Sequence, residues 1–283
     1  MQADSEPVII SDGTALEDFD VRPYFDGAGA VLAGTANVIM QLALAPVGYG
    51  VIESKVESGQ VMRHPFKRAR TTFTYLSVAM LGTDEDRDAY REAVNGSHRA
   101  VRSDAAGPVK YNAFDPALQL WVAACLYYGT VDIVERLHGP LPEAQADALY
   151  RFGARFGTTL QVRPEMWPTD RAAFAAYWDE TLATLSIDEP VRQYLHALMT
   201  DRHLPRLLRS PRFTAWVTTG FLPQPFRDQM GLTWSDADQR RFDTFLRRTG
   251  AVLRRLPLPL RNVPFNVLLR DMRRRRRVGR PLV

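Results

Sequence analysis

The sequence predicts an all-α protein folded as a single large helical domain. Apolar residues recur three or four positions apart along most of the 283-residue chain, and capping residues mark where many of these stretches begin. No segment alternates between polar and apolar residues as a half-buried strand would, so a sheet is not expected. With 46% hydrophobic residues and no Gly/Ser-rich or Pro-rich linker through its middle, the chain can bury one large core.

The first 45 residues divide into an acidic segment and an apolar helix. Residues 1–27 carry seven carboxylates and do not show the basic-then-apolar order of a secretory signal, so we expect a cytoplasmic protein. Residues 28–45 are small and apolar on nearly every side, which predicts a helix buried in the bundle. A membrane span is the alternative, but some eighteen residues with three polar side chains and two glycines are short for a bilayer.

The stretch 63–102 predicts two consecutive helices. The first follows Pro65, is mostly buried, and ends at Gly82. Thr83 then caps a second helix, whose first turn is acidic and whose end carries Arg99 and Arg102. A stripe three or four residues apart faces the core of this second helix, and it places the His98 imidazole inward: Tyr90, Val94, His98 and Val101.

The remaining helices follow the same rules. Asp115-Pro116 is a strong helix start, and an aromatic-rich helix runs from there to about residue 137; such a row of aromatics is more often core than cofactor wall. Prolines 205, 211, 223 and 225 divide a set of shorter helices. Further amphipathic helices are expected at 142–156, 169–185, 188–199 and 235–254.

Periodicity alone leaves the role of the conspicuous polar residues open. A single His on an apolar helix face is usually half-buried and bonded to a carbonyl. Arg68 and Thr72 share one helix face at i and i+4, which ordinarily makes a surface contact. Glu53, in the stretch 47–60, reads most simply as an exposed helix-surface carboxylate.

Order and spacing add a resemblance to a known family. Arg68-x-x-x-Thr72, Gly82 and His98 precede Tyr111-Asn112-Ala113-Phe114-Asp115-Pro116 and Leu120-Trp121-Val122. This series resembles the family of the latex-clearing rubber oxygenases and the mycophenolic-acid-pathway oxygenase MpaB, over roughly residues 28–235. The resemblance implies a globin-like helical core that holds a b-type haem, with His98 as the iron ligand and Arg68 and Thr72 near the haem.

The implied activity is a haem b-dependent oxygenase (an oxidoreductase) that uses O₂ on an apolar, unsaturated substrate such as an isoprenoid or lipid chain. A neutral imidazole on an apolar helix face suits haem iron, and Arg68 offers several charged donors to a propionate or to polarised oxygen. If the resemblance holds, Glu53 is placed where a carboxylate could act as a base on the distal side of the haem.

The sequence also departs from the family pattern. The lysine that precedes the threonine in latex-clearing enzymes is Thr71 here, and the common Trp-Val-His-Ala-Thr run reads Trp121-Val122-Ala123-Ala124-Cys125. The family histidine before a proline is replaced in Leu44-Ala45-Pro46. These losses leave His98 as the ligand but put substrate and activity in question. A non-catalytic helical member, or a haem sensor or carrier, is therefore the alternative.

Other chemistries find little support in the sequence. The four remaining histidines stand at predicted caps, turns or surfaces and form no pair or cluster with cysteine, which argues against zinc: His64, His138, His196 and His203. There is no nucleophile elbow and no phosphate-binding glycine loop. Cys125 lies in an apolar run and, as the one cysteine, suits a reducing compartment.

The C-terminal segment is strongly basic. Seven arginines and Asp271 give residues 270–283 a net charge of +6, so the rest of the chain carries −2. We therefore divide the chain into an acidic segment 1–27, a helical oxygenase-like domain 28–269 and an arginine-rich tail 270–283. Arg270 to Arg280 could bring the protein to anionic membranes, whereas a specific nucleic-acid partner is not expected of a mildly acidic body; a solvated terminus without such a role is the alternative.

Overall fold

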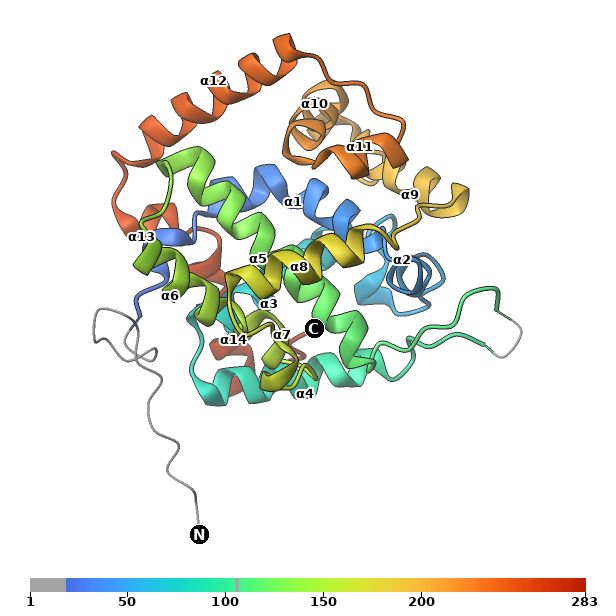
Figure 1. The fold of residues 1–283 in the computed structure, drawn as a ribbon. Helices are drawn as coiled ribbons and strands as arrows, with labels where there is room; N and C mark the ends of the chain where they lie inside the picture. The colour runs from blue at the N-terminus through green and yellow to red at the C-terminus, as the bar shows by residue number, and fades with distance from the viewer. Residues whose placement is uncertain (1–18, 105–106) are drawn as a thin grey trace.

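The computed structural model describes residues 19–104 and 107–283, and within them it is helical with no β-strand beyond one isolated bridge. This confirms the predicted all-α fold in a single helical domain (Figure 1). The α-helices are α1 (Gly27–Leu42), α2 (Ala45–Ile52), α3 (Pro65–Leu81), α4 (Asp84–His98), α5 (Pro116–His138), α6 (Glu143–Gly153), α7 (Arg155–Thr158), α8 (Arg171–Leu182), α9 (Glu189–Met199), α10 (Pro211–Phe221), α11 (Gln224–Gln229), α12 (Asp236–Leu253), α13 (Leu258–Arg261) and α14 (Phe265–Arg277). Short 3₁₀ turns stand at Arg22–Tyr24, Glu57–Gly59, Pro164–Met166 and Arg206–Leu208.

Helix α5 is the centre of the core and packs against α1, α7 and α12 (Figure 1). The crossing of α1 and α5 is close because small residues line it: a Cβ at Gly129 would stand 2.4 Å from the Asn37 amide nitrogen. That amide donates to the Cys125 carbonyl at 2.6 Å, and the fully buried Trp121 indole donates to the carbonyls of Met40 and Gln41. On α1 itself, a Cβ at Gly29 would stand 2.4 Å from the Ile133 side chain, so a small residue of the predicted first helix also serves this contact.

Two segments pass a length-and-hydropathy test for membrane spans, and both have a simpler explanation in the fold. Helix α5 passes alone, but 56% of its apolar window is buried against other helices, as in the core of a globular protein. Helices α1 and α2 pass together, yet they meet at 111°, so residues 28–45 do not form one straight span.

The aromatic side chains of α5 pack against those of α6 and α8. The Tyr127 ring meets Phe174 edge-on, with centroids 4.9 Å apart, and Tyr128 stacks on Trp178 at 4.3 Å. These rings build core, in line with the first interpretation of their pattern.

Helices α3, α4 and α14 form the second packing unit. Ser77 and Thr74 of α3 are buried, and their hydroxyls are still hydrogen-bonded. Each donates to the backbone carbonyl four residues before it. Thr83 and Asp86 form a reciprocal capping box that fixes the start of α4. Asp86 also binds Arg273 at 2.7 Å, so the cap of α4 is joined to α14.

Residues 270–277 of the arginine-rich segment continue α14, so the boundary placed at residue 270 falls inside a helix. Leu269 and Met272 are buried against Val78 and Tyr90, and Leu282 and Val283 pack on the same cluster. Arg273 and Arg276 pair with Asp86, and Arg275 pairs with Asp271. Arg270, Arg274, Arg277 and Arg280 face solvent.

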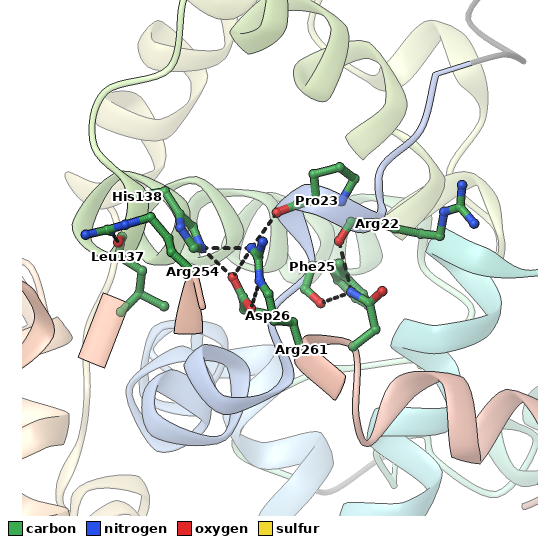
Figure 2. A network of polar contacts seen from close by, with 9 residues as sticks. Arg22, Pro23, Phe25, Asp26, Leu137, His138, Arg254 and Arg261 are labelled. Atoms are coloured by element: carbon green, nitrogen blue, oxygen red, sulfur yellow. Dashed lines mark hydrogen bonds and ion pairs between the residues drawn. The ribbon is translucent and has the colours of Figure 1, made fainter. Parts of the chain in front are cut away.

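The segment before α1 is joined to α5 and α13 by a buried ion-pair network (Figure 2). Asp26, whose side chain is 1% exposed, accepts from Arg261 at 2.8 Å and from His138. Asn262 donates to the carbonyls of Arg22 and Phe25. The segment before α1 is thereby fixed to the end of α5 and to α13. The acidic residues before Phe19 lie outside the described residues.

Two predicted helices end earlier than their patterns indicated. The helix expected to reach residue 102 ends at His98, because Val101 and Arg102 pair instead with the segment around Asn112. In the stretch 47–60, α2 ends at Ile52. The chain then turns, and the Ser54 hydroxyl oxygen accepts a hydrogen bond from the Val56 backbone N–H.

Candidate functional site

His98 is the last residue of α4, and its half-buried ring faces the interior as the apolar stripe predicted. The ring meets Phe114 edge-on, with centroids 6.2 Å apart and an interplanar angle of 89°. Its Nδ1 is buried and has no hydrogen-bond partner among the described residues. A buried nitrogen without a partner costs roughly 1–3 kcal/mol and calls for an explanation, which a bound group would supply.

The electrostatics of His98 keep its imidazole neutral. Burial is the larger cause and the positive charge of Arg68 the second, and together they lower the pKa of His98 to about 4. The sign follows because both effects disfavour the charged imidazolium. At pH 7 the ring therefore presents a lone pair, which is the state that a metal ligand requires.

Arg68 comes to this site from the first turn of α3. Burial lowers the pKa of its guanidinium, and this is the largest effect. The neighbouring phenols of Tyr194 on α9 and Tyr90 on α4 raise it. The guanidinium makes no hydrogen bond or ion pair to a described residue. A half-buried cation without a counter-charge is favourable only with an anion or a strong acceptor nearby.

Thr72 and Thr71 differ in what their hydroxyls do. Thr72 is half-buried one turn after Arg68 on the same face of α3, and its hydroxyl makes no hydrogen bond to a described residue. Thr71 is buried; its hydroxyl donates to the Arg68 carbonyl, and its own carbonyl accepts from the Tyr90 hydroxyl at 2.9 Å. Thr71 thus fixes α3 against α4, and Thr72 keeps a free donor near the site.

A chain of three amides holds the end of α4 in place. Gln161 donates from its side chain to Asn95 at 2.7 Å, one turn before His98, and its backbone N–H donates to Gln119 of α5 at 2.9 Å. Gln119 in turn donates to Gln161 and to the Ala113 carbonyl beside Phe114. The imidazole and the ring it contacts are therefore positioned by one network.

Glu53 stands at the C-cap of α2 and is exposed. Its carboxylate accepts from the Tyr111 hydroxyl at 2.8 Å, and the Tyr111 ring packs on Gly50. Burial first and Glu53 second raise the pKa of Tyr111 to about 12. Glu53 thus connects α2 to the loop after α4, and no contact with Arg68 or His98 is seen among the described residues. Its role as a base stays a prediction.

The structure brings Arg68 close enough to His98 to lower its pKa, with Thr72 one turn after Arg68 on α3, and it places Glu53 on a contact with the loop after α4. The roles of these residues stay predictions. Sequence reasoning did not find Tyr194, Asn95, Gln119 or Gln161, because their partners lie far along the chain. The Tyr111–Pro116 motif was the one signal that pointed to this neighbourhood.

The other histidines occupy different settings. His138 binds Asp26, and His64 lies 3.7 Å from Glu57 near the surface. His203 shares one feature with His98, since its Nδ1 is also buried without a partner and burial lowers its pKa. His203 does not belong to the series of motif residues that carries the family resemblance. Across residues 19–104 and 107–283, no three His, Cys, Asp or Glu side chains gather around a common point.

The comparison with protein families decides the kinship of this chain. Residues 22–255 match the family described as "ER-bound oxygenase mpaB/B'/Rubber oxygenase, catalytic domain". The chain belongs to this oxygenase family. The match spans α1 to α12 and includes every residue of the candidate site, so the family proposed from the order of Arg68, Thr72 and His98 is confirmed.

Two mycobacterial proteins resemble this member of the mpaB/rubber oxygenase family over nearly its full length. They are "Uncharacterized protein Rv2237" of Mycobacterium tuberculosis and "Uncharacterized protein Mb2261" of Mycobacterium bovis. Each is 52% identical over 255 residues, which cover 89% of this chain and 100% of the relative. No solved structure matches the chain.

Proposed function

We propose that this family member is a haem b-dependent oxygenase that acts with O₂ on an apolar, unsaturated substrate of isoprenoid or lipid type. The observation that carries the proposal is a buried, neutral imidazole nitrogen without a partner, next to a half-buried guanidinium without a counter-charge. Haem offers a partner to both, since its iron takes a neutral imidazole and its propionates take charged donors.

Each residue of the candidate site has a separate role in this proposal. His98 would hold the iron, and its edge-on contact with Phe114 and the Gln161 network would fix the orientation of the ring. Arg68 would bind a haem carboxylate or donate to an oxygen atom of the reactants, with the Thr72 hydroxyl as a second donor. When bound, haem supplies the activation of O₂. Glu53 is the candidate base for moving a proton at the edge of the site.

Haem binding is tested by absorption spectroscopy. The protein, as purified or after addition of haemin, should show an intense Soret band, and His98→Ala should lose most of it. His203→Ala is the matched control, because that ring is also half-buried with an orphaned Nδ1. A protein that takes up no haemin, or a His98→Ala variant that keeps the full band, would overturn the cofactor assignment.

Oxygen uptake separates an oxygenase from the alternatives. With squalene or methyl oleate as probe, the haem-loaded protein should consume O₂, and Arg68→Gln should keep its Soret band but react about 100-fold more slowly, as for the loss of one preorganised donor. A coloured protein without uptake on any apolar alkene would favour a haem sensor or carrier, and a colourless one a non-catalytic family member.

Contact with membranes through Arg270 to Arg280 remains a prediction for this protein. Four of these arginines face solvent, while Arg273, Arg275 and Arg276 are paired with carboxylates. This reduces the charge that α14 can offer to anionic lipids.

A further inference from the structure

The loop between α9 and α10 exposes two leucines at its tip. Leu207 is 98% exposed and Leu208 57%, and Phe213 at the start of α10 is 43% exposed. Leu207 is the most exposed large hydrophobic side chain of the described residues. Adjacent exposed leucines are unfavourable in water, and they indicate a surface that is covered by something apolar.

The loop is braced in this conformation. Asp201, buried at its base, accepts from the Ser210 backbone N–H at 2.8 Å and from the Thr214 hydroxyl at 2.9 Å. The Arg209 guanidinium donates to the carbonyls of Leu204 and Arg202 and closes the loop from within. The leucines are therefore presented on a preformed support.

The exposed charge of the loop is positive, since its carboxylate, Asp201, is buried at the base. Between Arg202 and Arg227 the sequence contains no Asp or Glu, and three further arginines flank the tip: Arg206, Arg209 and Arg212. These arginines give the exposed leucines a positive collar, which favours an anionic surface.

An arginine-rich face of α12 continues this surface. This α12 face is formed by Ala237, Arg240, Arg241, Thr244, Phe245 and Arg248. Its Phe245 meets Phe213 edge-on, with centroids 5.8 Å apart, so the α12 face adjoins the base of the loop. In Figure 1, α10 and α12 lie at the top of the molecule, whereas α14 lies in its lower part beside α4.

We propose that the loop 202–213 and the α12 face dock this protein onto bilayers that contain anionic phospholipids. Leu207 and Leu208 insert between the acyl chains, and the arginines of the loop and of the α12 face bind phosphate groups. A bilayer fits better than a protein partner, because two leucines offer far less than the roughly 1,000 Å² of a stable protein interface, whereas a shallow apolar tip with a basic collar suffices for an interfacial anchor.

The position of the loop gives this docking a consequence for the candidate site. The loop directly follows α9, and Tyr194 of α9 is a neighbour of Arg68. A docked loop would hold that end of α9 at the bilayer surface, where apolar substrates are concentrated. The docking proposal itself does not depend on haem or on turnover.

Site-specific fluorescence tests the insertion. The native Cys125 is fully buried, so a cysteine introduced as Leu208→Cys can be labelled selectively with an environment-sensitive NBD dye. With vesicles of phosphatidylcholine and phosphatidylglycerol, we expect a blue shift and increased intensity. Leu260→Cys is the matched control, because Leu260 is 58% exposed and its helix α13 lies away from α9 and α10 (Figure 1). A signal equal at both positions, or none at Leu208, would contradict insertion of this loop.

Vesicle flotation tests the energetic role of the loop and compares it with α14. Leu207→Ser/Leu208→Ser should weaken binding about tenfold or more, since two leucines leave the bilayer. Arg240→Gln/Arg241→Gln should weaken binding chiefly at low salt and only with anionic vesicles. Arg274→Gln/Arg277→Gln on α14 should have the smaller effect.

Three outcomes would overturn the proposal. The leucine variant could float as well as the parent protein, the α14 variant alone could lose binding, or the full-length protein could fail to bind anionic vesicles at all. Circular dichroism of each variant establishes that the fold is retained, and the exposed positions of the substituted side chains make this the expected result.

Discussion

At the scale of single residues, the candidate site depends on two side chains that lack partners in the described structure. His98 is neutral because it is buried and because Arg68 lies close to it, and Arg68 stays unpaired because no carboxylate of the described residues reaches it. Both residues were found in the sequence by order and spacing. The electrostatic effect of Arg68 on His98 could not be found in the same way, because 30 residues separate the two. Only the packing of α3 on α4 brings them together.

This coupling predicts a measurable change in the titration of His98. In protein prepared without haem, Arg68→Gln should raise the pKa of His98 from about 4, because one of the two causes that lower it is removed. The value should remain below the ordinary one, since burial is the larger cause. NMR titration of the histidine ring protons measures it, with His98→Gln for assignment. An unchanged pKa would place the guanidinium elsewhere.

The amide network is the part of the site that the sequence did not reveal. Gln119, Gln161 and Asn95 each read as ordinary polar residues of helices or loops, and nothing in their local pattern indicates a shared contact. A polar side chain acquires such a role only when tertiary packing excludes water around it.

At the scale of elements, helix crossings explain which glycines the fold requires. A Cβ at Gly250 of α12 would stand 2.0 Å from the Leu137 carbonyl oxygen of α5, a backbone atom that cannot move aside. A Cβ at Gly34 of α1 would meet nothing within 4 Å. Both glycines lie inside predicted helices, and the sequence pattern alone does not distinguish them.

This contrast predicts opposite effects of the same substitution. Gly250→Ala should lower the free energy of unfolding by about 1–3 kcal/mol, because the added methyl group separates α12 from α5. Gly34→Ala should raise it by up to about 1 kcal/mol, because alanine favours the helix and fills open space. Urea unfolding followed by circular dichroism measures both. Equal effects of the two substitutions would contradict the crossing of α5 and α12.

At the scale of the whole molecule, the segment before α1, the end of α5 and α13 are held together by Asp26, His138 and Arg261 (Figure 2). Burial by itself would raise the pKa of the Asp26 carboxyl, but hydrogen bonds from His138 and Arg261 outweigh burial and hold it below its ordinary value. A carboxyl with a lowered pKa in the folded state stabilises the protein at all pH values above its pKa in the unfolded chain.

The network therefore predicts a pH-dependent cost of Asp26→Asn. At pH 7 the variant should be less stable by about 3 kcal/mol, because Arg261 loses its buried counter-charge. The difference should persist down to about pH 4 and shrink below it, as the Asp26 carboxyl of the parent protein takes up its proton. Urea unfolding between pH 3 and pH 7 measures it.

Asp20→Asn is the control for this experiment. Asp20 pairs with Arg22 at 2.7 Å, but both side chains are largely exposed, so its loss should change stability by less than about 1 kcal/mol. A cost of Asp26→Asn that grows as the pH falls would contradict the assigned sign of the pKa shift.

The sequence by itself determined the all-α class, most of the helix starts, the family and the inward direction of His98. These depend on local rules: helical periodicity, capping residues and the order of a few motif residues. It placed the end of the His98 helix too late and divided the chain at residue 270, within what is a continuous helix. The ends of helices depend on competing contacts that a local pattern does not contain.

Only the tertiary structure decided which polar groups share a site and which apolar ones stay uncovered. Three features depend on how segments far apart in the sequence pack together. They are the approach of Arg68 to His98, the pairing of Asp26 with Arg261 and the exposure of Leu207. The physical reason is that burial and charge coupling act through space: a side chain's neighbours, and thus its pKa and its contact with water, are fixed when helices pack.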